Sequence, residues 1–407
     1  MTQIAVPDSL QRFAGRILDC DSHEQMPAQV WVEHFGEVAR PFAEIMMQSP
    51  PTNPNHSNVA GYAGDTREIS AETIWSVKGP TSPGAVDAAR RPEILDTMGV
   101  SRQLMFPTSI GLWGGALYTA PEESSLYAHF KENTRSYAEK LFAANNDWAV
   151  RAAQVSPRIR PVTPLFGETP AAMLACAQKL LASGIRAVSV PSAIPPADIS
   201  PAHPDFDPLY ALLAEANVPL TLHLGTELIF FRTDKWRAAP AFEGYKVNEE
   251  LSMDPWWLSV MHIPAQNFLG TLINGGVFHR HPNLRFGVLE CGAHWVGPLA
   301  KLLDVWYDNN QSTGLKDWGD SYRGRRMPLR PSEYIARNVR VNPYDFEPID
   351  EYIDRYGLED VFCFGSDYPH VEGGKDPMGR LAGRLERLGP RMLEKFFVTN
   401  GEWLLPN

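Results

Sequence analysis

The stretch DCDSH at residues 19–23 ends the first short apolar run of this 407-residue chain. Two later stretches have the same setting, because LHLG at 222–225 and GSDYPH at 365–370 also end apolar runs. Histidine and carboxylate side chains are the usual ligands of a catalytic metal. A barrel of parallel strands gathers such side chains at the C-terminal ends of its strands. Together the three stretches favour a metal enzyme over a binding module.

Eight short apolar runs without polar alternation predict parallel strands that are buried on both faces. They span residues 16–21, 103–107, 161–166, 187–190, 219–223, 284–289, 339–342 and 361–365. Helical patterns lie between them, among them 122–144, 171–181, 207–216 and 295–308. The alternation predicts the α/β class and a single (β/α)8 TIM barrel over residues 1–407, with long insertions after strands one and five.

Composition limits the class of protein and its partners. The chain is 44% hydrophobic, its formal charge is −11, and it has no run of Lys and Arg, which argues against nucleic acid and anionic membranes. Cysteines 20, 176, 291 and 363 show no paired spacing, as expected in a reducing cytoplasm. No targeting segment or long apolar run is present, so we expect a soluble cytoplasmic protein. The expected partner is a small-molecule substrate, and a homodimer is the assembly that we consider.

Two connections are too long to be plain loops. Residues 41–91 are rich in Pro, Gly, Ser and Asn, and a connection of this length is usually a functional lid or disordered. We expect a lid. Residues 226–262 are rich in large aromatic side chains. They directly follow the strand end that carries His223, so they are expected to overhang the site.

The aromatic insertion gives most of the predicted substrate contacts. Aromatic residues at this density also form local cores, and a cationic side chain among them also occurs on a solvated surface. If the segment lines the pocket, an arginine there can bind a carboxylate or phosphate, and the substrate is bulky, partly apolar and anionic. The predicted substrate-binding residues here are Phe230, Phe231, Arg232, Trp256 and Trp257.

The chain resembles the amidohydrolase-related metal enzymes typified by aminocarboxymuconate-semialdehyde decarboxylase. The resemblance rests on DSH at 21–23, the His223 strand end, GVFHRHPNLRF at 276–286, ECGAHW at 290–295 and GSDYPH at 365–370. It implies a TIM barrel with a divalent metal held by a strand-one pair, a strand-five histidine and a strand-eight aspartate. In this sequence those positions are Asp21, His23, His223 and Asp367.

Each of these ligands also has a structural interpretation. Asp21 and His23 are two residues apart and point to one side of an extended segment, so both can bind one ion. Alone, Asp21 could cap a loop, His223 could be a core imidazole and Asp367 could cap a helix. Their joint occurrence favours the metal. We expect one ion, with two allowed, and zinc with iron or manganese as alternatives, because mixed carboxylate and imidazole ligands select zinc weakly.

Glu290 is the departure from the pattern of the decarboxylases, which commonly carry a histidine at the end of strand six. A carboxylate there could act as acid and base in hydrolysis, help to bind a second metal, or orient a ligand histidine. His262 and His294 are further acid/base candidates that could reach the barrel mouth, although each is more often structural. Trp295, Asn342 and His370 are predicted pocket residues.

The resulting hypothesis is a hydrolase that cleaves an ester, thioester, lactone or amide with metal-activated water, with Asp367 and Glu290 moving the proton. The alternative is a metal-dependent, non-oxidative decarboxylase of an aromatic or unsaturated carboxylic acid. A third possibility is a barrel that has lost its metal and only binds ligands, and the intact ligand set makes it the weakest of the three.

Overall fold

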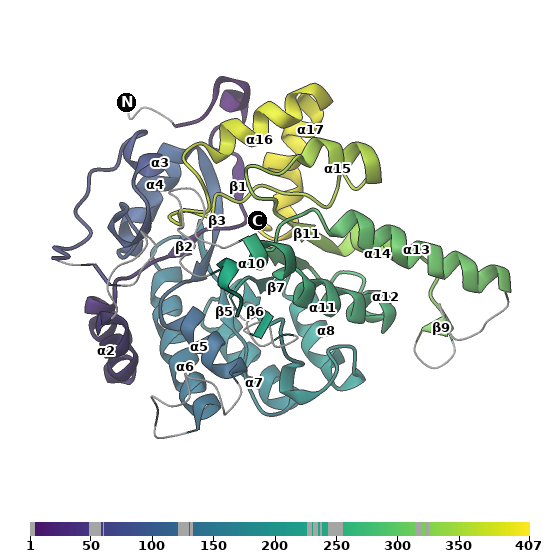
Figure 1. Cartoon of the computed structure of the whole chain (residues 1–407), viewed down its shortest axis with the longest axis horizontal. Helices are drawn as coiled ribbons and strands as arrows, with labels where there is room; N and C mark the ends of the chain where they lie inside the picture. The colour runs from purple at the N-terminus through teal and green to yellow at the C-terminus, as the bar shows by residue number, and fades with distance from the viewer. Residues whose placement is uncertain are drawn as a thin grey trace.

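A barrel of parallel strands lies at the centre of the computed structural model (Figure 1). The structure describes residues 5–48, 58–59, 61–120, 130, 133–225, 230, 235–236, 238–242, 255–313, 320–321 and 325–407. The barrel strands are β1 (Ile17–Asp19), β2 (His23–Glu24), β3 (Val100–Pro107), β4 (Ile159–Pro161), β5 (Thr163–Pro164), β6 (Val188–Ser189), β7 (Leu220–His223), β8 (Phe286–Leu289) and β11 (Val339–Val341). The predicted α/β class and TIM barrel are confirmed.

The strands close into a ring through two sheets and one irregular segment. β1 and β2 both pair with β3, β3 pairs with β4, and the second sheet has the order β11-β8-β7-β6-β5, with every pairing parallel. β4 and β5 are consecutive in the chain, which joins the sheets on one side. On the other side, residues 361–365 take the eighth position. Val341 bridges Phe362 in parallel, and the Cys20 amide donates to the Phe364 carbonyl at 2.9 Å.

The helices form the outer layer around this ring (Figure 1). They are α1 (Trp31–Phe35), α2 (Arg40–Gln48), α3 (Thr73–Ser76), α4 (Arg91–Met98), α5 (Ile110–Thr119), α6 (Thr134–Ala153), α7 (Pro170–Ala182), α8 (Asp207–Glu215), α10 (Pro255–Val260), α11 (Ile263–Asn274), α12 (Val277–Arg280), α13 (Val296–Thr313), α14 (Pro331–Asn338), α15 (Ile349–Tyr356), α16 (Pro377–Leu385) and α17 (Pro390–Glu394). Short 3-10 turns join many of them, and a small hairpin of β9 (Asp320–Ser321) and β10 (Arg325–Arg326) follows α13.

One predicted helix, 122–144, is placed differently. α6 begins at Thr134, where the Asn133 side chain caps it by accepting from the Ser136 amide at 3.1 Å, and it continues to Ala153. The preceding α5 contains three glycines, which disfavour a helix in isolation. Gly111 is needed there because a Cβ would lie 2.5 Å from the Pro107 side chain. Close packing of α5 against α6 therefore overrides the low helix propensity.

The barrel interior is filled by apolar side chains and is closed at one end by the C-terminal tail. Leu18, Leu104, Val162 and Leu289 from different strands form one cluster with Leu404 and Leu405. Such layered filling is typical of a TIM barrel, whose centre is a packed core. All four cysteines are free, three of them buried, in agreement with their unpaired spacing in the sequence.

The structure describes parts of the two long connections, residues 41–91 and 226–262. In the first, the Gly79 amide donates to the Pro369 carbonyl at 2.8 Å and the Tyr368 hydroxyl donates to the Pro83 carbonyl at 2.5 Å, so its second half packs on the GSDYPH stretch. In the second, Trp257 packs with Met261 and Tyr344. Phe231 and Arg232 lie outside the described residues. The lid remains a prediction.

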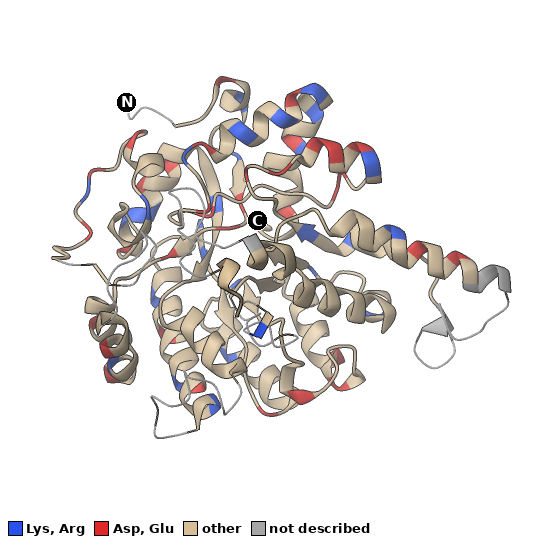
Figure 2. Ribbon diagram, in the orientation of Figure 1, with Lys and Arg blue, Asp and Glu red and all other residues tan. Residues whose placement is uncertain are grey.

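Figure 2 shows a mainly acidic α15 beside an α16 whose charged residues are basic. Arg387, just after α16, pairs with Asp350 and Asp354 of α15 at 2.5 and 2.6 Å. Within the described ranges, no helix combines the length and the hydropathy needed to cross a membrane.

Leu404 and Leu405, which we call the C-terminal plug, allow a test of the barrel core. Leu404 is fully buried, so Leu404→Ala should lower the free energy of unfolding by about 2–5 kcal/mol through lost burial and a cavity. Leu302 on α13 is 52% exposed. Leu302→Ala should therefore change the free energy of unfolding by less than about 0.5 kcal/mol. Urea unfolding followed by circular dichroism measures both. Equal effects of the two substitutions would contradict the plug.

Candidate metal centre

Strand ends from four parts of the barrel bring six potential ligands together at its C-terminal face. His23 and His223 belong to β2 and β7, and Glu290 directly follows β8. Two groups of ligand atoms form, each with all atoms within 4.8 Å of one another. One consists of His23, Glu290, Asp367 and His370, and the other of Asp21, His23 and His223. His23 is common to both groups, so the six side chains make one centre.

The backbone aims the two carboxylates that follow the strands. Glu290 and Asp367 both have a φ of 52°, in the left-handed region that non-glycine residues seldom adopt. Such strained positions persist where the surrounding structure fixes them, often at functional sites. The Glu290 amide donates to Asn342 Oδ1 at 2.9 Å and the Tyr344 hydroxyl donates to the Glu290 carbonyl at 2.7 Å. These contacts hold the Glu290 turn.

His23 lies at the middle of the charged groups. Its Nε2 is 3.5 Å from Asp21 Oδ1, 3.3 Å from Asp367 Oδ1 and 3.5 Å from Glu290 Oε2. His223 Nε2 is 3.4 Å from Asp21 Oδ1 and 3.2 Å from Glu290 Oε2. Three carboxylates therefore surround His23 Nε2, and two of them also approach His223 Nε2.

The unsatisfied atoms at this point fit a divalent cation. His23 Nε2 and both carboxylate oxygens of Asp367 are buried and have no hydrogen-bond partner among the described residues. Burying such groups without partners is costly, and buried charges are normally paired or bind metal. Two imidazoles with carboxylates match the ligand types of zinc, iron and manganese sites. The predicted set is divided between the two groups: Asp21, His23 and His223 lie in one, and His23, Asp367 and Glu290 lie with His370 in the other.

Residues behind the ligands orient the histidine rings. His223 Nδ1 donates to the Leu224 carbonyl at 2.8 Å, which leaves Nε2 with the lone pair that a metal needs. Thr108 Oγ1 lies 2.9 Å from His23 Nδ1 and 2.8 Å from His370 Nε2, so one hydroxyl orients two imidazoles. The His23 and His370 rings stack with centroids 3.8 Å apart.

Two further polar side chains orient the aspartates. Asn342 Nδ2 donates to Asp21 Oδ2 at 2.8 Å, so this predicted pocket residue bridges Asp21 and the Glu290 turn. Asp19 accepts from the Ser366 amide at 2.8 Å and from its hydroxyl at 2.6 Å. Burial raises the pKa of Asp19 to about 7 despite these hydrogen bonds. Asp19 therefore ties strand one to the GSDYPH stretch.

Burial and neighbouring charges together shift the pKa values of the remaining groups. It raises the pKa of Glu290 to about 8, and the nearby negative charge of Asp367 adds to the effect. It lowers the pKa of His370 to about 4, and the positive charge of His23 acts in the same direction. Burial acts to raise the pKa of Asp367, but His370 and His23 outweigh it and lower that pKa overall.

The other predicted residues lie outside the two ligand groups, in different settings. Trp256 and Trp257 border the small cluster of Met261 and Tyr344. Trp295 is buried in the main core, and its indole NH donates to the Gly292 carbonyl at 2.9 Å. Phe230 lines an outer groove between α11 and α13. The roles of these side chains in substrate binding remain predictions.

The two acid/base candidates outside the ligand set contact each other. The His262 and His294 rings are 4.6 Å apart and edge-on. Burial lowers the pKa of His262 to about 4, with His294 adding to the effect. The His294 amide donates to Glu347 Oε2 at 3.1 Å.

Sequence reasoning missed Lys78 and Thr108. Lys78 lies in the first long connection, and its ammonium is buried without a hydrogen-bond partner in the described part of the chain. Burial lowers the pKa of Lys78 to about 8, and Asp367, Asp345 and Glu372 partly oppose this shift. A lone lysine in a Pro-rich segment gives no signal in the sequence. Thr108 follows β3, and its position at a strand end was the available clue.

An apolar hollow of about 50 Å³ adjoins His223. Phe106, Leu112 and Leu224 are among the residues that line it. The centre is therefore polar on the ligand side and apolar on the side of β3 and β7, as in many small-molecule sites.

Comparison with known proteins agrees with this geometry. The sequence profile of the amidohydrolase family matches residues 119–406. The chain belongs to the amidohydrolase family. A comparison of this chain with curated protein sequences found no match.

Solved structures of similar fold cover nearly the whole chain. An amidohydrolase from Mycobacterium avium subsp. paratuberculosis K-10 is 20% identical, with a TM-score of 0.66 and coverage of 96% of this chain and 99% of its own. A 5-carboxyvanillate decarboxylase from Novosphingobium aromaticivorans, complexed with manganese and 4-hydroxy-3-methoxy-5-nitrobenzoic acid, is 17% identical, with a TM-score of 0.59 and full coverage of both chains. A 2,6-dihydroxybenzoate decarboxylase from Rhizobium is 14% identical, with a TM-score of 0.55 and coverage of 96% and 98%. At these identities the similarity establishes the barrel fold.

Metal analysis tests the candidate centre of this amidohydrolase. After reconstitution with zinc or manganese and removal of free ions, the wild type should retain about one ion per chain, measured by mass spectrometry. Asp367→Asn removes a buried charged ligand and should lower the retained metal at least about tenfold. Glu351→Gln, on the exposed surface of α15, is the matched control and should bind like the wild type. Equal metal content in all three proteins would contradict the assignment.

Proposed function

We propose that this amidohydrolase is a metal-dependent hydrolase that uses metal-activated water to cleave an acyl bond of a bulky, partly apolar, anionic small molecule. The observation that carries the proposal is the Glu290 carboxylate, 3.2 Å from His223 Nε2 and 3.5 Å from His23 Nε2. A carboxylate at this position can take and return a proton where a water is activated. The bond would be an ester, thioester, lactone or amide.

A divalent ion bound by Asp21, His23, His223 and Asp367 would supply an activated water and polarise the scissile carbonyl. The side chains of the protein manage the protons. Burial raises the pKa of Glu290, so its carboxylate form is a stronger base that can accept a proton from the attacking water and return it to the leaving atom. The water oxygen bonds to the acyl carbon, the bond from carbon to the leaving atom breaks, and the transferred proton neutralises that atom.

His370 and Thr108 extend the proton path. His370 Nδ1 is 3.0 Å from Asp367 Oδ1 and 3.9 Å from Glu290 Oε2. Its other nitrogen contacts Thr108, which also contacts His23. This arrangement keeps the His370 ring fixed beside both carboxylates.

Lys78 supports an anionic substrate. Its buried ammonium lies in the field of Asp367, Asp345 and Glu372 yet has no hydrogen-bond partner in the described part of the chain. A buried ammonium without a partner is costly, and a substrate carboxylate would supply one. The apolar hollow beside His223 would contact an apolar part of the same substrate.

Decarboxylation is the second candidate. His370 favours it, because an imidazole stacked on His23 and within 3.0 Å of Asp367 is a group that can deliver a proton to carbon as carbon dioxide leaves. Two of the similar solved structures are decarboxylases of aromatic carboxylic acids, and one contains manganese. In this chain the end of β8, the sixth strand expected from the sequence, carries Glu290 in place of the histidine expected for that chemistry.

Glu290→Gln separates the two reactions. In the zinc- or manganese-loaded enzyme, we expect hydrolysis of a reactive aryl ester, thioester, lactone or amide to fall about 10²- to 10⁴-fold because the acid/base is lost. The assay follows product formation by chromatography, and metal content is measured on the same samples. Loss of activity with metal retained supports acid/base catalysis, whereas loss of both makes Glu290 a ligand. Glu351→Gln serves as the control.

A parallel assay measures carbon dioxide released from 2,6-dihydroxybenzoate and 5-carboxyvanillate. Release of carbon dioxide by a wild-type enzyme that hydrolyses none of the acyl probes would overturn the hydrolase proposal in favour of decarboxylation. Hydrolysis that is unchanged in Glu290→Gln would remove Glu290 from the mechanism.

Lys78→Met tests the anionic substrate. It removes the charge and keeps most of the apolar stem, so the KM for a carboxyphenyl ester should rise about 10- to 100-fold, as expected for a lost charge-assisted hydrogen bond. The KM for the uncharged phenyl ester should stay within about twofold, because that probe has no anionic group. Lys301→Met, at an exposed position of α13, is the matched control. Equal changes for both esters would show that Lys78 does not recognise charge.

A further inference from the structure

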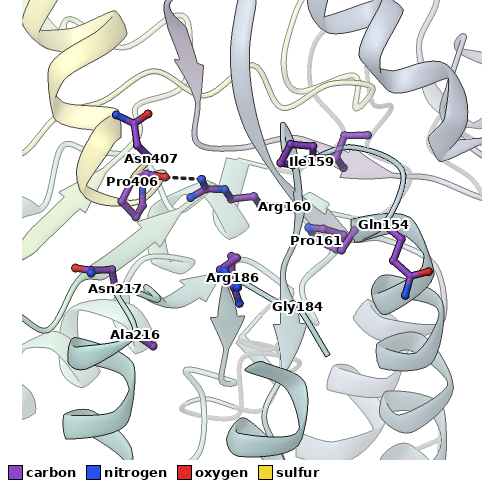
Figure 3. A pocket seen from close by; sticks show the side chains of 12 residues that line it. Gln154, Ile159, Arg160, Pro161, Gly184, Arg186, Ala216, Asn217, Pro406 and Asn407 are labelled. Atoms are coloured by element: carbon purple, nitrogen blue, oxygen red, sulfur yellow. Dashed lines mark hydrogen bonds between the residues drawn. The ribbon is translucent and has the colours of Figure 1, made fainter. Parts of the chain in front are cut away.

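The end of the barrel opposite the metal centre contains a second cavity, of about 420 Å³. Its lining residues come from strand starts, from the turns before them and from the C-terminal tail: Arg160 is in β4, Arg186 precedes β6 and Asn217 precedes β7. Strand starts form the N-terminal face of a TIM barrel, whereas catalytic residues lie at the C-terminal face. The cavity, whose lining residues Figure 3 shows, is therefore separate from the proposed active site.

The charge of the cavity is positive. Arg160 and Arg186 both line it, and no Asp or Glu occurs among its lining residues. Arg102 is close enough to act on the same group, since burial, Arg102 and Arg186 together lower the pKa of Arg160 to about 10. Neither Arg160 nor Arg186 forms an ion pair with a carboxylate in the described part of the chain. Arg160 and Arg186 thus line the cavity without a paired Asp or Glu side chain, whereas Arg102 lies in the field of Glu402.

The hydrogen bonds of these arginines use only part of their donor capacity. Arg160 donates through Nη2 to the Pro406 carbonyl, and Arg186 donates through Nη1 to the Ile185 carbonyl at 3.0 Å. A guanidinium has five N–H donors in a planar fork that matches the oxygens of phosphate and carboxylate. Asn217 Oδ1 accepts from Arg285 at 3.0 Å, which leaves the amide NH2 group of Asn217 as a donor at the cavity wall.

We propose that this cavity binds a phosphate group, either as inorganic phosphate or as a small phosphate ester, between Arg160 and Arg186. A compact dianion balances several positive charges at once and accepts hydrogen bonds on each oxygen. The cavity is large enough for a phosphate with a small organic substituent. The proposal does not depend on the hydrolase chemistry at the other end of the barrel.

The bound phosphate stabilises the closed end of the barrel. Arg102 donates to the Leu405 carbonyl at 3.0 Å and to Asn407 Oδ1 at 2.7 Å, and Arg160 donates to the neighbouring Pro406 carbonyl. The same tail inserts Leu404 and Leu405 into the barrel core. An anion that relieves the repulsion between these arginines strengthens their hold on the tail, and ligand binding to the native state raises its stability.

Calorimetric titration of the full-length, metal-loaded protein tests the site. Inorganic phosphate and glycerol phosphate are titrated separately at constant ionic strength set with sodium chloride, which removes general screening effects. We expect saturable binding of phosphate and a rise in melting temperature that chloride alone does not produce. Arg186→Gln should weaken binding at least about tenfold, as expected for a lost charge-assisted contact. Tighter binding of glycerol phosphate would identify a phosphate ester as the ligand, and tighter binding of inorganic phosphate would identify the free ion.

Arg186 is exposed and its substitution should leave the fold intact. Arg355→Gln, also exposed and on α15, removes one positive charge elsewhere and should bind phosphate like the wild type. Equal binding by the two variants would place any bound phosphate outside this cavity, for example at the metal centre, and would overturn the proposal. An absence of saturable binding to the wild type would do the same.

A chemical measurement avoids reliance on the variants. Phenylglyoxal modifies accessible arginines, and peptide mass spectrometry locates the modified residues. Phosphate should protect Arg186 in the wild type and leave the modification of Arg355 unchanged. Equal modification of Arg186 with and without phosphate would overturn the proposal.

Discussion

The convergence of three buried carboxylates on two imidazoles is the constraint on which the catalytic end of this protein depends. Asp21, Glu290 and Asp367 all approach His23 Nε2 within 3.5 Å. Carboxylates buried this closely repel each other unless a cation or a proton lies between them. The centre therefore requires positive charge, and the unpartnered oxygens of Asp367 are the atoms best placed to bind it.

The barrel and its connections supply the fixed geometry around that charge. Strand pairing places His23 and His223 at the same face, while Thr108 and Asn342 orient the ligands from behind. Ligand orientation by such supporting residues governs metal affinity and activity. The first long connection adds Lys78, so a cationic group accompanies the anionic centre at the place where we propose that substrate binds.

The sequence was most informative where potential metal ligands lie at strand ends. His23, His223 and Asp367 each end an apolar run, and strand ends of a barrel share one face, so their convergence was predictable. Lys78 was not predictable, because its approach to the centre depends on how a long connection folds over residues 368 and 369. The helix α5 was missed because packing of its glycines against α6 and the strand end outweighs their low propensity. His370 was predicted to contact substrate, and the structure places it among the potential ligands.

The most direct test of the metal centre is a crystal structure of the manganese- or zinc-loaded protein with diffraction measured on both sides of the metal absorption edge. We expect an anomalous peak about 2.0–2.2 Å from His23 Nε2, His223 Nε2 and a carboxylate oxygen of Asp367. An anomalous peak elsewhere in the chain, or no peak in fully reconstituted protein, would contradict it.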